Sequence, residues 1–385
     1  MLLSFVYKTP EALAMKSFFR MMILVLAPAA IAAQTPGGAP PDALDGLDPV
    51  MLVQGKEVEG KSAFSLAHGP FTYLFSTAET KAAFQREPAK YEIQLGGLCA
   101  RMGKTTGANP ADYLVYKGKI YVFGSDECHK RFAANPEKYL PSARVPLTAS
   151  RALLTKGQQL IEDAARAVGD PKAIDAVTTY IETFSQVQKR AIGEVNVTTK
   201  TTWSFPGRVR QERAMSMTGK TMSSATVLAP DGMWFVTGGG QAYPMPAAGR
   251  DSLEQDFGRH PFALLKARKS TGLKAASVGP ARIEGADVEQ VRVATARFDI
   301  TVNLDAQRRI HSIRFNDRNG EGIYGTYTLL YSDYKTADGL TLPRTVRALF
   351  DGQPDPISSW TVDSIAINTP VDPSMFAPKA SEPGK

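Results

Sequence analysis

The spacing of hydrophobic residues changes character part-way along this chain. Residues 149–168 place apolar side chains at helical spacing, which predicts an amphipathic helix. Asp170-Pro171 is a typical helix start, and we expect this second helix to run to about Gln188. From Ala191 onward, short segments such as FDITVNL and IHSIRF alternate apolar and polar residues instead. A helical connection therefore leads into a region built of strands.

Turn signals separate the alternating segments. Pro206-Gly207, Asp231-Gly232 and Asn319-Gly320 each lie between two of them. Roughly ten strands joined by short turns favour one antiparallel sheet, and a sheet of that size is expected to curve strongly. Residues 250–269 interrupt the strands with a helical insertion. The pattern as a whole predicts an α+β protein.

A repeat with an offset of 48 residues precedes the helices and spans residues 48–141. Each copy has a short aromatic strand, TYLF or IYVF, followed by a helical pattern, for which Ser76 and Ser125 are the expected N-caps. A module of about 45 residues is too small to form a stable core alone, so we expect pairing of the two copies, a disulfide or a metal to compensate. The identical pairs are Tyr73 and Tyr121, Phe75 and Phe123, Glu79 and Glu127, Phe84 and Phe132, Pro88 and Pro136, Lys90 and Lys138, and Tyr91 and Tyr139.

The N-terminus has the three-part layout of a secretory signal. Lys16 and Arg20 precede an apolar run, and Ala30-Ile31-Ala32 is a small-residue cleavage site. The run is shorter than the roughly 20 residues that span a bilayer, so we expect no transmembrane helix after cleavage near Ala33. Met15 is an alternative start. These features predict a periplasmic or secreted protein.

These boundaries divide the chain into seven parts. They are a signal peptide at 1–33, a flexible leader at 34–47, repeats at 48–94 and 95–141, a helical linker at 149–169, the sheet domain at 170–378 and a tail at 379–385.

Composition narrows the class of partner. The formal net charge is +7, and basic residues are spread along the chain with acidic ones between them. This distribution is typical of a solvated surface and not of a nucleic-acid groove. Hydrophobic residues make up 43%, enough for sizeable cores. We therefore expect no nucleic acid among the partners.

The repeat resembles the YHS domain family. The resemblance rests on Asp48-Pro49-Val50, on the aromatic strands, on the Cys128-bearing segment and on AANPEKYL at 133–140. It implies small modules that are suspected of binding metal and that occur beside metal-transport machinery. In the first copy Met51 and Thr80 stand where the family has cysteines, which argues against metal binding by that copy.

Residues 170–378 resemble the LolA/LolB-like lipoprotein carriers in the order of their segments. PGRVRQER, DGMWFV, a helix and NLDAQRRIHSIRF follow one another, with DGLTLPRTV further on. The resemblance implies a half-open barrel whose concave apolar face holds acyl chains or other hydrophobic ligands beneath helices.

Two sets of residues are candidates for function. The chain has two cysteines, Cys99 and Cys128, which are compatible with a disulfide, with free buried thiols, or with a soft-metal site for Cu(I) or Zn(II) that includes Met102 and His129. Neighbouring helix residues point about 100° apart, which disfavours Cys128 and His129 binding one ion. The second set, from the strands, either lines a ligand pocket or forms a closed core. It comprises Trp203, Trp234, Phe235, Phe298, Ile300, Val302, Phe315 and Trp360.

No catalytic signature accompanies these sets. The four histidines form no HExxH pair, no Gly-x-Ser-x-Gly motif is present, and no Gly-Lys-Ser/Thr follows the glycine run Gly238-Gly239-Gly240. We therefore expect a non-enzymatic, exported binding protein for a hydrophobic or lipid-like ligand, with a YHS unit that binds metal or docks a partner. The alternatives are a soft-metal or redox protein centred on Cys99 and Cys128, and a structural partner of an envelope complex.

Overall fold

The computed structural model describes residues 40–103, 106–142, 144–190, 193–245 and 247–377. The chain divides into two compact units, Met1–Pro136 and Glu137–Lys385. The predicted signal peptide at 1–33 and the tail at 379–385 lie outside the described residues. Within the described ranges, no helix has both the length and the apolar character needed to cross a membrane.

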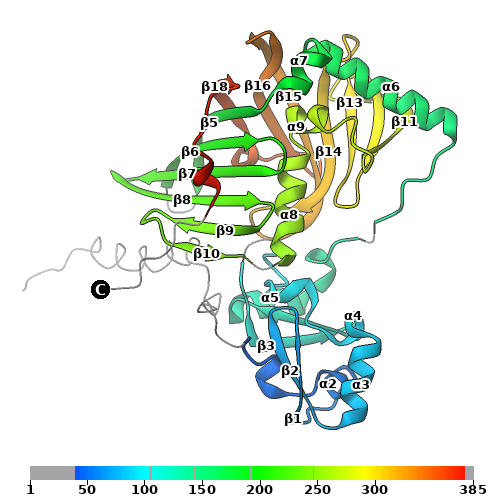
Figure 1. Ribbon diagram of the computed structural model, residues 1–385, viewed down its shortest axis with the longest axis vertical. Coiled ribbons are helices and arrows are strands. Elements are labelled where there is room, and N and C mark those ends of the chain that lie inside the picture. Colours follow the sequence, from blue (N-terminus) through cyan, green and yellow to red (C-terminus); the bar gives the residue numbers. More distant parts are fainter. Residues whose placement is uncertain (1–39, 104–105, 143, 191–192, 246, 378–385) are drawn as a thin grey trace, which may run out of the picture. The chain divides into compact units, whose positions relative to one another are not determined.

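The first unit repeats its elements with the offset seen in the sequence. Two antiparallel hairpins, β1–β2 and β3–β4, are each followed by a nine-residue helix, α3 or α5 (Figure 1). In chain order the elements are η1 (Leu44–Gly46), α2 (Pro49–Val53), β1 (Lys61–His68), β2 (Phe71–Phe75), α3 (Ala78–Arg86), α4 (Pro88–Tyr91), η2 (Gln94–Gly97), β3 (Asn109–Tyr116), β4 (Lys119–Phe123), α5 (Asp126–Ala134) and η3 (Pro136–Lys138), which reaches the unit boundary.

Each copy packs the same aromatic triplet. The Phe84 ring lies 4.8 Å from the Tyr73 ring and 5.3 Å from the Phe75 ring, measured between centroids. In the second copy, Phe132 lies 5.3 Å from Tyr121 and 5.2 Å from Phe123. The two copies share a core, because Ile120 and Val122 of β4 pack with the first triplet. Joint packing is what a module of this size requires.

Two sequence expectations for this unit were wrong. The N-cap of α3 is Thr77, which forms a reciprocal capping box with Thr80, and not Ser76. The Ser76 hydroxyl instead donates to the carboxylate of Asp48, 2.7 Å away. The leader at 34–47 is structured where it is described, because Ala43 and Leu44 are fully buried and the Ala43 N–H donates to the Thr72 carbonyl. Burial of two apolar side chains outweighs the turn-forming composition around them.

The second unit is dominated by one curved antiparallel sheet of 14 strands in the described residues. The strand order is β10-β9-β8-β7-β6-β5-β18-β16-β15-β14-β13-β12-β11, with β17 on the edge of β16, so β10 and β11 form open edges. The strands are β5 (Thr179–Arg190), β6 (Gly193–Ser204), β7 (Arg208–Met217), β8 (Lys220–Ala229), β9 (Gly232–Thr237), β10 (Ala242–Pro244), β11 (Lys274–Ile283), β12 (Ala286–Ala294), β13 (Asp299–Leu304), β14 (Ile310–Arg318), β15 (Tyr324–Ala337), β16 (Leu340–Phe350), β17 (Gln353–Pro354) and β18 (Trp360–Ile367). The predicted α+β class with an open, curved sheet is confirmed.

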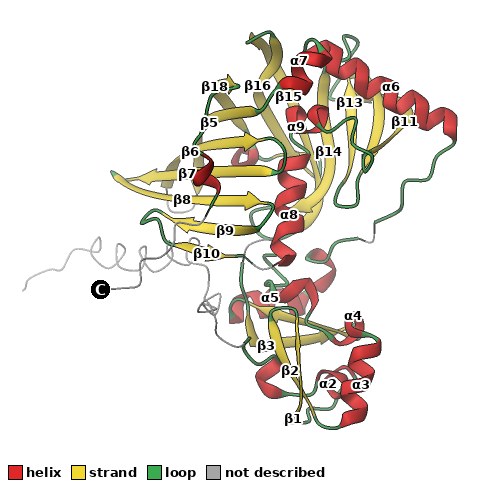
Figure 2. Cartoon of the chain, in the orientation of Figure 1, coloured by secondary structure: helices red, strands yellow, loops and turns green. Residues whose placement is uncertain are grey.

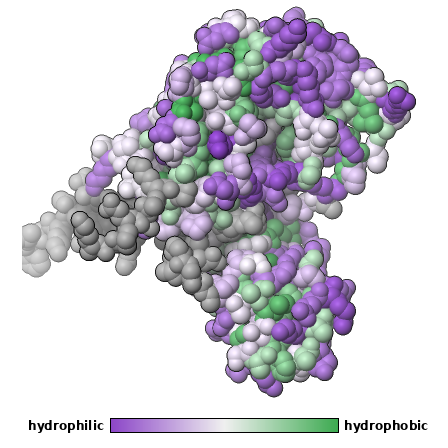
Figure 3. Space-filling model, in the orientation of Figure 1, coloured by the Kyte–Doolittle hydropathy of each residue, from purple (hydrophilic) through white to green (hydrophobic). Residues whose placement is uncertain are grey.

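Four helices pack on one face of this sheet, which we call the helix-covered face (Figure 2). They are α6 (Arg151–Val168), α7 (Pro171–Ala176), α8 (Ala247–Gly258) and α9 (Pro261–Lys266), and short turns η4 (Pro356–Ser358) and η5 (Pro373–Phe376) complete the unit. Gly157 lets α6 lie directly against β11, because a Cβ at this position would come within 2.6 Å of the Ala275 backbone. The opposite side of α6 is hydrophilic, as the purple surface at the upper right of Figure 3 shows.

The second predicted helix was largely wrong. Asp170 does cap a helix, but α7 ends at Ala176, and β5 occupies the residues from Thr179 onward. The run Val177-Thr178-Thr179 is β-branched and favours a strand. The next residues alternate between the two faces of the sheet, as their pairing with β6 requires. The insertion expected at 250–269 is present as α8 and α9.

Candidate functional site

The large sheet is split between two of its strands. β18 pairs with β5 from Thr361 to Ile367, but with β16 at two positions, Thr345 with Thr361 and Val346 with Trp360. β18 begins at Trp360. No described strand therefore joins the residues that follow Ser185 in β5 to those that follow Val346 in β16. The sheet therefore opens at this point.

A groove of about 720 Å³ occupies the split. Typical small-molecule pockets measure roughly 300–1,000 Å³. Val187 at the rim is 54% exposed, which is unusual for an apolar side chain and marks a surface suited to an apolar ligand. Side chains alternate along β5, so Val187 points away from the face that carries Tyr180 and Glu182. The lining residues are Ser185, Gln186, Val187, Asn196, Val197, Thr198, Thr345, Val346, Arg347, Ser359, Trp360 and Thr361.

Trp360 separates this groove from a second, internal cavity. The internal cavity measures about 20 Å³, room for about one water molecule. Val346 and Trp360 line both spaces. The Trp360 ring stacks on Phe184 with centroids 5.1 Å apart, and its Nε1 is buried with no hydrogen-bond partner in the described part of the chain. Val346 and Trp360 thus form the wall between the groove and the internal cavity.

A buried polar cluster surrounds the internal cavity. The Tyr180 hydroxyl donates to Glu182 Oε2 at 2.9 Å, and His260 Nε2 lies 3.2 Å from the same oxygen. Burial alone raises the pKa of Glu182, but His260, Tyr180 and Arg344 outweigh it and hold that pKa below its usual value. Burial, with the charge of Glu182, raises the pKa of Tyr180 well above its ordinary range. Glu182 is therefore an ionised carboxylate inside an apolar core.

Several nitrogens near this cluster are buried without a partner among the described residues. They are Trp203 Nε1, His260 Nδ1, Arg344 Nε and Trp360 Nε1. The Trp203 and His260 rings are close, with centroids 4.8 Å apart, and Arg344 interacts electrostatically with Glu182. Each unpartnered donor costs about 1–3 kcal/mol, so a hydrogen-bond acceptor from water or ligand would be stabilised here.

The eight predicted lining residues do not share one surface. Five of them belong to the core packed beneath α6, α8 and α9, which is the closed-core alternative of the two that the sequence allowed. They are Trp203, Phe298, Ile300, Val302 and Phe315. Trp234 and Phe235 are half-buried neighbours on β9 and point to opposite faces. Trp360 lines the groove.

Sequence reasoning missed much of the site. Phe184, Val187 and Glu182 fell in the segment read as helix, and Val197 and Val346 gave no signal beyond ordinary strand alternation. His260 carries no motif that would single it out in the sequence. It is the N-cap residue of α9, without a side-chain cap bond, and it contacts Glu182.

The cysteines lie in the first unit as free thiols, Cys99 fully buried and Cys128 7% exposed. Of the three alternatives for this pair, the structure has the free buried thiols, and the disulfide stays a prediction. Met102 donates its backbone N–H to Cys99, whereas His129 Nδ1 contacts Asp112 Oδ1 at 2.5 Å and its ring stacks on Phe123. In the described ranges, no three His, Cys, Asp or Glu side chains are placed to hold a metal ion.

One family model matches part of the chain. Residues 104–143 match the YHS domain family, and this range contains most of the second copy of the repeat. No curated protein is significantly similar to this chain in sequence.

Several solved structures are similar to part of the chain. A putative outer membrane lipoprotein-sorting protein domain from Vibrio parahaemolyticus is 14% identical, with a TM-score of 0.38, over 58% of this chain and 97% of its own. A LolA superfamily protein from Nitrosomonas europaea is 9% identical, with a TM-score of 0.39, over 57% and 96%. A DUF1329 family protein from Desulfovibrio piger is 10% identical, with a TM-score of 0.37, over 58% and 97%. At such low identity and overlap, these structures say nothing of what this chain binds.

Proposed function

We propose that this protein is an exported carrier or binding protein, without enzymatic activity, for a hydrophobic, lipid-like ligand that enters the split between β5 and β16. The observation that carries the proposal is the groove of about 720 Å³, which shares Val346 and Trp360 with an internal cavity beside buried, unpartnered donors. An apolar chain would lie along Val187 on the outer face of the sheet. A carbonyl or carboxylate of the ligand would accept hydrogen bonds near Trp360. In this proposal the YHS unit contributes a docking surface for an envelope partner.

The internal cavity holds about one water molecule, which limits how deep a ligand reaches in this conformation. Deeper insertion would require Trp360 to leave its stack on Phe184. Ligand binding should therefore change the environment of an indole ring, and tryptophan fluorescence would report it. The internal cavity is too narrow for a ligand to reach Glu182 and His260 without this rearrangement. We therefore propose that these two residues hold the surrounding structure in place.

Placing a charge in the groove tests the proposal. We expect Val187→Asp to weaken binding of a fluorescent long-chain fatty acid by roughly tenfold or more, because a carboxylate would have to lose water against the apolar chain. Val187 is 54% exposed, so folding should be unaffected. The matched control is Val278→Asp on β11, where the valine is 58% exposed and lies outside the groove. Equal binding by the two variants, or no binding by the unmodified protein, would contradict the proposal.

The indole nitrogen of Trp360 can be tested separately. Trp360→Phe keeps a ring on Phe184 and removes Nε1, and we expect affinity for the same fatty acid to fall about fivefold, the equivalent of one hydrogen bond worth about 1 kcal/mol. Trp234→Phe on β9 is the control, since Trp234 lines neither space. If Trp360→Phe binds as tightly as the unmodified protein, the polar end of the ligand does not reach this nitrogen.

A further inference from the structure

The first unit places two thiols against each other at the start of a helix. Cys99 follows η2 and forms an isolated parallel bridge with Val122 of β4. Cys128 lies in the first turn of α5, where its N–H donates to the Ser125 hydroxyl at 3.3 Å. The two thiol groups are close enough for each to shift the pKa of the other. Cys128 keeps 7% of its surface exposed, whereas Cys99 is fully enclosed.

We propose that Cys99 and Cys128 form an oxidisable dithiol site, in which Cys128 attacks a small hydroperoxide and Cys99 then closes a disulfide. Exposure assigns the roles, because the oxidant can reach Cys128 and not Cys99. This site shares no residue with the groove in the sheet unit, so its test is independent of the proposed carrier function.

The surroundings favour the negative charge on Cys128. Arg101 Nη1 donates to Cys128 Sγ across 3.7 Å, and Cys128 lies in the first turn of α5, where the helix dipole favours negative charge. The hydrogen bond from Cys99, followed by those of Ser125 and Arg101, lowers the pKa of Cys128 to about 5 despite its burial. The same thiol contact, with burial, raises the pKa of Cys99 above its usual range. One thiolate and one thiol is the pairing that a nucleophile and its resolving partner need.

The reaction balances with a hydroperoxide as the oxidant. The Cys128 thiolate attacks the distal oxygen, an S–O bond forms, the O–O bond breaks, and the alcohol or water leaves after taking up a proton. Cys128 is then a sulfenic acid, and the peroxide has been reduced by two electrons. Cys99 loses its proton, attacks Cys128 Sγ, and expels water as the S–S bond forms. Two thiols and one hydroperoxide thus give one disulfide, one alcohol or water, and one further water.

Intact mass after treatment with hydrogen peroxide tests the sequence of steps in the full chain. We expect the protein to lose two hydrogens and both free thiols, and a reductant to restore them. Cys99→Ser should instead stop at a sulfenic acid on Cys128 that a dimedone probe captures. Cys128→Ser should leave Cys99 unreacted at the same dose. Oxidation of Cys99 in Cys128→Ser at the unmodified rate, or a metal ion retained on both thiols in the native mass, would overturn the proposal.

A pH profile tests the role of Arg101 as a positioning residue. The rate of alkylation by iodoacetamide should rise with a midpoint near pH 5 in the unmodified protein, compared with roughly 8.5 for an ordinary cysteine. Arg101→Met should move that midpoint upward. Lys130→Met removes an exposed cation from α5, the helix that carries Cys128, and should leave the midpoint unchanged. A midpoint near 8.5 in the unmodified protein is incompatible with a Cys128 thiolate at neutral pH.

Discussion

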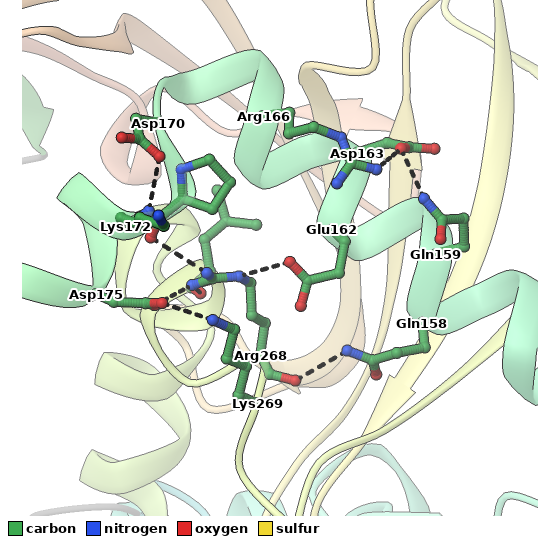
Figure 4. A network of polar contacts seen from close by, with 12 residues as sticks. Gln158, Gln159, Glu162, Asp163, Arg166, Asp170, Lys172, Asp175, Arg268 and Lys269 are labelled. Atoms are coloured by element: carbon green, nitrogen blue, oxygen red, sulfur yellow. Dashed lines mark hydrogen bonds and ion pairs between the residues drawn. The ribbon is translucent and has the colours of Figure 1, made fainter.

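Arg268→Met is expected to lower the free energy of unfolding of the sheet unit by about 3–5 kcal/mol, the usual cost of removing one member of a buried ionic cluster. The Arg268 side chain is fully buried and connects three segments, as Figure 4 shows. Nε donates to Glu162 of α6 at 3.0 Å and Nη1 donates to Asp175 of α7 at 2.7 Å. Nη1 also donates to the Leu265 carbonyl of α9 at 2.9 Å. Methionine would fill the volume but remove the hydrogen bonds to Glu162 and to the Leu265 carbonyl, and it would leave Asp175 with Lys269 alone.

Thermal and urea unfolding measure this loss, which should lower Tm on the order of 10 °C for a domain of this size. Lys269→Met is the matched control, because Lys269 Nζ lies 2.7 Å from the same Asp175 but its side chain is 62% exposed. Exposed ion pairs contribute about 0–1 kcal/mol, so this variant should unfold almost like the unmodified protein. Similar, small effects of both substitutions would mean that desolvation of Arg268 offsets its contacts. In that case apolar packing alone would hold α6, α7 and α9 together.

Local patterns predicted the first unit well. The offset of 48 residues places Phe84 and Phe132 in matching aromatic triplets, because side chains that recur at fixed spacing in similar segments meet the same neighbours. The same offset carries Ser125 back to Thr77, the true N-cap of α3. Ser76 is one residue out of the register of the repeat.

The buried polar cluster explains why the sequence of β5 predicted a helix. Tyr180, Glu182 and Phe184 occupy one face of the strand, so a carboxylate stands where an apolar residue would have completed the alternation. A functional or strained position is where local patterns are expected to fail. Asp170-Pro171 was a genuine helix start, but nothing in a start signal determines the length of the helix.

The groove could not be predicted from local sequence. It exists because β18, the last strand in the chain, inserts between β5 and β16 and begins only at Trp360. That pairing joins residues far apart in the sequence, and no short-range pattern encodes it. Apolar alternation likewise identified Phe298 and Ile300 as inward-facing, but whether helices cover them depends on tertiary packing.

Replacing Glu182 is the sharpest test of the buried polar cluster. The carboxylate is 5% exposed and is held by Tyr180 and His260. Glu182→Gln preserves the shape and can still accept from Tyr180, but it removes the charge. Hydrogen bonds to charged groups contribute about 1.5–3 kcal/mol each, so we expect a loss of about 2–3 kcal/mol in unfolding free energy at pH 7. Urea midpoints would measure it.

The dependence on pH distinguishes lost charge from disturbed packing. An unfolded glutamate titrates near pH 4.3, and the folded pKa of Glu182 lies lower, so its contribution is complete above about pH 5 and is lost as pH falls through the folded pKa. The stability difference between the unmodified protein and Glu182→Gln should therefore shrink as pH falls from about 5 to 3. Glu212→Gln is the control, because this carboxylate is 40% exposed, pairs with Arg210 at the surface and should change stability by less than about 1 kcal/mol. A difference that stays constant over this range would mean that Glu182 acts through shape alone, and the buried carboxylate would then have no electrostatic part in holding His260 and α9 against the sheet.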